Sequence, residues 1–176
     1  MDQLNSNDYS QPNVAGNPAL EIVHDYSQSA TLTLTFSPAV VDPVVHIGRL
    51  GGYVGLGGPL AVSNSSLLTL GDGLTWTVDS VHRNGSHFSA TSNTVERRVG
   101  DLMNNPTLAM DAFNRGSAGG SLEITGTVDR IVLTLESSGT ALAGSLDSFE
   151  ILVTEPPVTA CGGEALLQGS KIALQG

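Results

Sequence analysis

Basic side chains are scarce in this sequence. Lysine and arginine contribute 7 residues against 17 acidic ones, and Lys171 is the only lysine. A nucleic-acid-binding protein needs a basic surface that displaces counterions from phosphates, and docking on an anionic membrane surface needs the same. The composition therefore excludes nucleic acid as a partner and disfavours an anionic membrane. The formal net charge of −10 is compatible with solubility and with binding of divalent cations.

Cysteine and long apolar runs are nearly absent as well. Cys161 is the single cysteine, which excludes an internal disulfide, and we interpret it as an incidental thiol in a C-terminal tail. No apolar run approaches the about 18 residues of a membrane span, so we expect no membrane insertion. The start, Met1 to Leu4, lacks the basic and apolar regions of a signal peptide. A secreted chain with this start would already have lost its targeting sequence.

Charged and aromatic residues are also few. Charged residues make up 14% of the chain, whereas a soluble domain typically has about a quarter. Surface polarity must then come from Ser, Thr, Asn and Gly, which is typical of extracellular β proteins. Aromatic residues make up only 5%, which is little for a carbohydrate-binding module that stacks sugars on exposed rings. Trp76 reads as a core residue, so Tyr53 is the remaining candidate for ligand binding.

Alternation of polar and apolar residues is the clearest pattern that the sequence does contain. The segment 31–36 reads Thr-Leu-Thr-Leu-Thr-Phe, which predicts a strand with one buried face. Further strands are expected at 20–24, 44–50, 67–70, 74–78, 121–125, 130–135 and 148–154. In the segment 44–50, strict alternation places His46 and Leu50 on one face and Val45, Ile47 and Arg49 on the other.

Turn-forming residues separate these segments. Ser37-Pro38 and Asp42-Pro43 are expected to bracket one turn, and Gly71-Asp72-Gly73 is expected to form a hairpin turn. The glycine-rich residues 51–59 read as a loop. Residues 101–118 break the pattern and read as a long crossover, with one helical turn over 107–114.

These features predict an all-β fold. We expect an antiparallel β-sandwich of jelly-roll or Greek-key type, with eight to ten strands and at most one short helix. Residues 1–18 read as a polar N-terminal arm and 19–157 as the sandwich domain. Residues 158–176 read as a C-terminal tail or extra strand.

Three segments carry a resemblance. They are Thr33 to Pro38, Val41 to Gly52, and Asp147 to Ile151. Together they resemble a β-sandwich module of large, adhesin-type bacterial surface proteins, over about residues 20–157. The resemblance implies an extracellular structural or adhesive role and offers no catalytic residue to transfer. The tail after Pro157 has no counterpart in it.

No catalytic constellation emerges from the residues, so we predict that the chain is not an enzyme and carries no cofactor. Glu123, Glu136 and Glu150 lie on separate strands and are expected on solvent-facing positions. His46 is expected to be a hydrogen-bonded core or edge residue. Many serines allow a Ser-His-Asp set on paper, but the sequence has no nucleophile-elbow motif.

Calcium is the one ion whose binding the sequence leaves open. Six aspartates are expected in loops, namely Asp72, Asp79, Asp101, Asp111, Asp129 and Asp147. Carboxylates and backbone carbonyls are the ligands that calcium prefers. We take Asp72, Asp101 and Asp111 as candidate calcium ligands. The alternative is that these aspartates only solubilise turns.

The sequence supports three functional hypotheses. The first is a non-catalytic extracellular structural or adhesive domain of a bacterial surface protein, with neighbouring domains, other copies, a glycan or a protein as partner. The second is a self-assembling subunit of an extracellular filament or tube that exchanges strands through its termini. The third is a carbohydrate-binding module centred on Tyr53.

Overall fold

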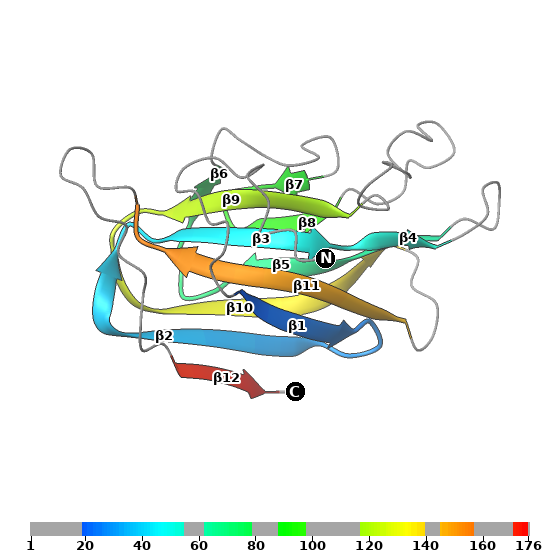
Figure 1. Ribbon diagram of the computed structural model, residues 1–176, viewed down its shortest axis with the longest axis horizontal. Coiled ribbons are helices and arrows are strands. Elements are labelled where there is room, and N and C mark those ends of the chain that lie inside the picture. The colour runs from blue at the N-terminus through cyan, green and yellow to red at the C-terminus, as the bar shows by residue number, and fades with distance from the viewer. Residues whose placement is uncertain are drawn as a thin grey trace.

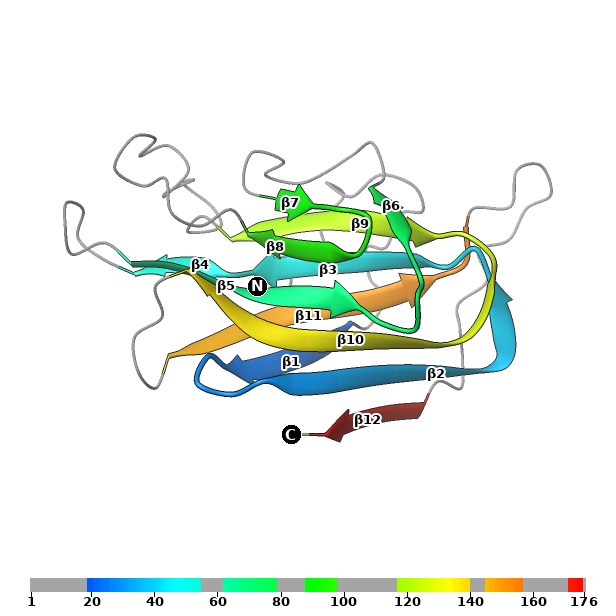
Figure 2. The same cartoon turned by 180° about the vertical axis from the view of Figure 1, so that it is seen from behind.

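The computed structural model describes residues 19–54, 62–78, 88–97, 117–139, 145–156 and 171–175. These residues form two antiparallel sheets packed face to face (Figure 1), and the second view shows the larger sheet in front (Figure 2). No helix is present among them, and none is therefore long and apolar enough to cross a membrane. The all-β sandwich expected from the sequence is confirmed.

The two sheets contain twelve strands within the described residues. The five-stranded sheet has the order β1 (Leu20–Asp25), β11 (Leu146–Thr154), β3 (Val44–Leu50), β9 (Ala118–Ile124) and β6 (Trp76–Val78). The seven-stranded sheet has the order β12 (Lys171–Gln175), β2 (Ala30–Val41), β10 (Thr127–Gly139), β5 (Val62–Leu70), β8 (Thr94–Arg97) and β7 (Phe88–Ala90), with β4 (Gly52–Val54) also paired to β5.

The strand order is that of a jelly roll. Eight principal strands, β1, β2, β3, β5, β8, β9, β10 and β11, can be numbered one to eight in chain order. One sheet then reads 1-8-3-6 and the other 2-7-4-5, so the chain crosses between the sheets at most connections. The remaining strands β4, β6, β7 and β12 extend these sheets, and three of them span only three residues.

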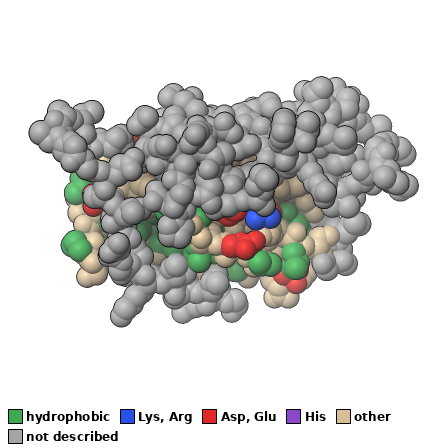
Figure 3. Space-filling model, viewed as in Figure 1, with side chains coloured by type: hydrophobic (Ala, Val, Ile, Leu, Met, Phe, Trp, Pro, Cys, Tyr) green, Lys and Arg blue, Asp and Glu red, His purple; other side chains and the backbone are tan. Residues whose placement is uncertain are grey.

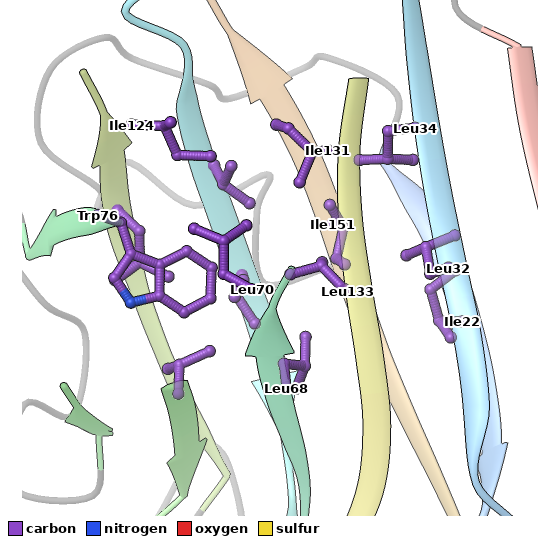
Figure 4. Close-up of a cluster of buried hydrophobic side chains, with 14 of the residues drawn as sticks. Ile22, Leu32, Leu34, Leu68, Leu70, Trp76, Ile124, Ile131, Leu133 and Ile151 are labelled. Carbon is purple, nitrogen blue, oxygen red and sulfur yellow. The ribbon is translucent and has the colours of Figure 1, made fainter. Parts of the chain in front are cut away.

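The core fills the space between the sheets, as Figure 4 shows for its central part. Alternation decides which side chains enter it: Leu32 and Leu34 of β2 and Leu133 of β10 are buried, while the threonines between them face outward. Trp76 is 3% exposed, and its indole N–H donates to the Thr91 carbonyl at 2.9 Å, as expected of a core residue.

A bulge in β3 changes the expected faces of that strand. The register between β3 and β9 shifts between Ile47 and Leu50, and Arg49 has a left-handed φ of 61°. An extra residue reverses the parity beyond it. Leu50 therefore joins Val45 and Ile47 in the core instead of sharing the face of His46. The strictly alternating prediction for residues 44–50 was wrong at this point.

The turn predicted between Ser37 and Pro43 is shorter than expected. The strand β2 continues to Val41, because a register shift opposite Val128 and Arg130 leaves Pro38 in a stretch without ladder partners. The turn proper lies at Asp42. Its carboxylate accepts the Gly126 N–H at 2.6 Å, and its own N–H donates to the Gly126 carbonyl at 2.8 Å. Two sheet-to-sheet connections are thereby fastened together.

The structure corrects two other turn predictions. Gly71-Asp72-Gly73 is a tight turn, but β6 pairs with β9 in the opposite sheet, so the turn is a crossover and not a hairpin. Part of the glycine-rich stretch 51–59 is the strand β4, paired with β5. The helical turn expected over 107–114 lies outside the described residues.

Candidate functional site

A cluster of polar side chains lies between the sheets at one end of the sandwich. We call it the interior polar cluster and define it as His24, Tyr26, Gly51, Asn64, Ser66, Arg97 and Asp147. It forms where β1 ends, β11 begins and β3 runs towards β4, at the right of Figure 1. All seven residues are buried.

Asp147 is the central acceptor of this cluster. It shares the inward face of β11 with Phe149 and Ile151, and only 4% of its surface is exposed. The Gly51 N–H donates to its two carboxylate oxygens at 3.1 and 3.2 Å, and the Ser66 N–H donates to Oδ2 at 2.8 Å. Burial raises the pKa of Asp147 above its ordinary value, and the backbone hydrogen bonds from Ser66 and Gly51 oppose that rise. The sequence reading of Asp147 as a loop aspartate was wrong.

Gly51 lets the chain pass close to the cluster. Its φ of +66° is left-handed, which favours glycine. A Cβ atom there would lie 2.7 Å from the Asn64 carbonyl oxygen and 2.9 Å from both Cβ and Cδ of Arg97. The aliphatic part of Arg97 is thus packed directly against the Gly51 backbone. This contact keeps the Gly51 N–H in reach of Asp147.

Arg97 brings a cation into the interior. Its side chain is fully buried, and its backbone N–H donates to the Ser65 hydroxyl at 2.9 Å. Burial lowers the pKa of Arg97, while the nearby Tyr26 and Asp147 raise it. Arginine stays protonated in proteins, so this end of the core contains a positive charge with Asp147 as a neighbouring acid.

Tyr26 completes this group from the end of β1. Its hydroxyl donates to Asn64 Oδ1 at 3.4 Å. Burial is the main cause that raises the pKa of Tyr26 far above its ordinary value, and the negative charge of Asp147 adds to it. The hydroxyl therefore remains a neutral donor over the physiological range.

His24 and Ser66 form a separate pair within the cluster. His24 Nδ1 lies 2.8 Å from the Ser66 hydroxyl, and Nε2 lies 2.9 Å from the Gln28 carbonyl oxygen. A carbonyl can only accept, so the geometry assigns the ring proton to Nε2, and Nδ1 accepts from Ser66. In a Ser-His-Asp triad the acid binds the second ring nitrogen. Here Asp147 binds the Ser66 backbone instead, and Ser66 is fully buried.

A second polar group lies on the outer face of the five-stranded sheet. His46 is fully buried and bonds to the Ser121 hydroxyl at 2.8 Å and the Thr154 hydroxyl at 2.9 Å, which confirms the prediction of a hydrogen-bonded histidine. Arg49 pairs with Glu150 at 3.3 Å and with Glu21 at 3.5 Å. Figure 3 shows basic and acidic side chains in contact on this face of the molecule.

Glu150 was predicted to face solvent, but the structure buries it. Its side chain is only 7% exposed, and it pairs with Arg49, which lies at the bulge of β3. Glu123 and Glu136 are exposed, as expected. Alternation alone assigned all three glutamates to the outer faces. It could not show that one of those faces is partly covered.

The predicted calcium ligands are not brought together by the described residues. Asp72 lies in the crossover turn with a φ of 57°, and its carboxylate pairs with Arg130 at 2.8 Å. Asp101 and Asp111 lie outside the described residues, as does Asp79. Asp129 is an exposed residue of β10 and not a loop residue. In the part of the chain that the structure describes, no three His, Cys, Asp or Glu side chains form a group able to hold a metal ion.

The predicted ligand-binding residue is placed only by its backbone. Tyr53 belongs to β4, opposite Ser63 of β5, and its ring lies outside what the structure describes. Cys161 lies outside the described residues too. The buried indole of Trp76 removes the one tryptophan as a stacking surface for sugars.

Sequence reasoning missed the interior polar cluster, although one signal was present. Asp147 has the parity of Phe149 and Ile151, and His24 has the parity of Ile22, so both occupy inward positions by alternation. Asn64 also begins an Asn-Ser-Ser glycosylation pattern, but its side chain is buried. A comparison with family models, curated proteins and solved structures finds no match to the chain.

Proposed function

We propose that this chain is a non-catalytic structural or adhesive domain of an extracellular bacterial surface protein. The observation that carries the proposal is that the side chains able to do acid–base or nucleophilic chemistry point into the interior. His24, Ser66 and Asp147 are buried, and their hydrogen bonds go to one another and to the backbone. Such a network fixes the end of a sandwich, because each buried polar group that lost its partner would carry a desolvation cost.

The outer face of the seven-stranded sheet supports an adhesive role. A row of threonines crosses four strands: Thr31 of β2, Thr134 of β10, Thr69 of β5 and Thr94 of β8 are cross-strand partners in sequence. All four are partly exposed. Neighbouring strands lie about 4.8 Å apart, so the row presents hydroxyl and methyl groups at regular intervals. A protein domain or a glycan could hydrogen-bond to such an uncharged surface.

The proposal is tested by locating the chain on the cells that produce it. An antibody raised against the folded domain should label intact cells, and brief protease treatment of intact cells should remove the label. A cytoplasmic protein serves as the control and should stay unlabelled until the cells are permeabilised. Labelling that requires permeabilisation would contradict an extracellular role.

A second candidate function, a self-assembling filament subunit, is favoured by one element. The strand β12 hydrogen-bonds only to β2 within the described residues, at the edge of the seven-stranded sheet. An edge strand held by a single neighbour is the kind of element that proteins exchange between copies.

A further inference from the structure

One edge of β2 pairs with an extended strand, β12. β2 spans Ala30–Val41, and β12 covers only Thr31 to Thr35. An edge strand presents a row of N–H and C=O groups that another chain can pair with. In this sheet the position next to β2 is filled by a strand from the far end of the sequence, after an intervening segment.

The register shows why this edge selects β12. Ile172 and Leu174 are the partners of Leu34 and Leu32, which are core residues with 4% and 0% exposure. Lys171, Ala173 and Gln175 are the partners of the three threonines Thr35, Thr33 and Thr31. The apolar positions of one strand therefore coincide with those of the other. A slip of one residue would place these apolar positions opposite threonines, so the edge favours a strand with this alternation in this parity.

The chain between β11 and β12 is long enough to reach another molecule. β11 ends at Thr154 and β12 begins at Lys171, which leaves residues 155–170 between them. Sixteen residues span up to about 55 Å when extended. A domain of about 140 residues has a radius of gyration of only about 14 Å. The segment can therefore place β12 on a neighbouring copy.

We propose that β12 of one copy occupies the β2 edge of a second copy, in the register seen within one chain. This inference rests on the second candidate function and names its partner as another copy of this chain. Both forms make the same five residue pairs, so they differ chiefly in the entropy of closing the segment. A flexible segment gives β12 an effective concentration in the millimolar range at its own β2 edge. Exchange is therefore favoured where the local concentration of other copies approaches that value.

Disulfide trapping tests the proposal on the full-length chain with Cys161→Ser, which leaves only introduced cysteines. Thr33 and Ala173 are cross-strand partners, so we combine single variants Thr33→Cys and Ala173→Cys at high protein concentration and oxidise them. Exchange predicts a disulfide between the two proteins. The control mixture is Thr94→Cys with Ala173→Cys, because β8 lies three strands away from β2.

The double variant Thr33→Cys/Ala173→Cys completes the test. Exchange predicts dimers and higher oligomers linked by disulfides, in addition to closed monomers. Only closed monomers, together with no cross-link in the mixture, would show that β12 stays on its own chain and would overturn the proposal. Absence of any disulfide would overturn it as well. Electron microscopy separates the two ideas: cross-linked copies without filaments would retain strand exchange and reject the filament role.

Discussion

Replacing Gly51 by alanine should destabilise the fold more than the same change at Gly73. The two glycines have nearly the same left-handed conformation, with φ of +66° and +71°. They differ in their surroundings. A Cβ at Gly51 would meet three atoms closer than 3.0 Å, whereas a Cβ at Gly73 would meet nothing within 4 Å. Gly73→Ala is therefore a matched control for the backbone strain alone.

The expected magnitudes follow from these two contributions. A left-handed conformation costs a residue with a Cβ about 1–2 kcal/mol, which applies to both variants. Overpacking of a filled interior costs about a further 1–3 kcal/mol and applies to Gly51 only. The free energy of unfolding should fall by about 1–2 kcal/mol in Gly73→Ala and by about 2–5 kcal/mol in Gly51→Ala.

Urea unfolding monitored by the fluorescence of Trp76 measures both variants. The single buried indole reports on the core without interference from other tryptophans. With a urea dependence of about 2 kcal/mol per molar, the midpoint of Gly51→Ala should lie about 0.5–1.5 M below that of Gly73→Ala. Equal midpoints would refute the close packing of Arg97 against Gly51.

Three further predictions concern charged and hydroxyl groups. Asp147→Ala should lower the free energy of unfolding by about 3–5 kcal/mol, because it leaves the Arg97 cation and two backbone N–H donors buried without their acceptor. Asp147→Asn keeps an acceptor oxygen and should lower it less. Equal losses in the two variants would argue against the hydrogen-bonding role. Tyr26 has a raised pKa in the folded state, so stability is fully present below the ordinary tyrosine pKa of 10 and falls by about 1.4 kcal/mol per pH unit above it. Tyr26→Phe should remove that alkaline component, and alkaline unfolding curves with the same slope for both proteins would contradict it. Arg130→Ala should change the unfolding free energy by less than about 1 kcal/mol, since its pair with Asp72 is exposed, and a larger loss in the urea titration would disagree.

Alternation predicted seven of the eight principal strands and most of the core, but it missed β8 (Thr94–Arg97). Thr31 to Phe36 and Arg130 to Leu135 lie in β2 and β10, where each buried side chain has the expected parity. Alternation could not predict which strands pair. For example, β5 and β6 are adjacent in sequence yet belong to opposite sheets. Local turn residues specify a reversal and not the sheet in which the chain continues.

The polar cluster illustrates a different limit. Parity placed Asp147 inside, but an isolated carboxylate in a core is costly, so sequence reasoning assigns it to a loop. What makes the buried carboxylate acceptable is a set of donors from distant segments, namely the backbone of Gly51 and Ser66 and the neighbouring Arg97. Only the jelly-roll connections bring these segments together.

The pairing of β1 with β11 has a mechanical consequence. Leu20, at the start of β1, lies opposite Ile151, near the end of β11, so the chain enters and leaves the jelly roll side by side. A pulling force applied just before Leu20 and just after Thr154 would peel β1 away one hydrogen bond at a time, and not load all of its bonds together. Tension between these two points would therefore open the domain easily. A domain held at these two points alone would yield to tension between them long before a domain whose end strands are pulled along their length.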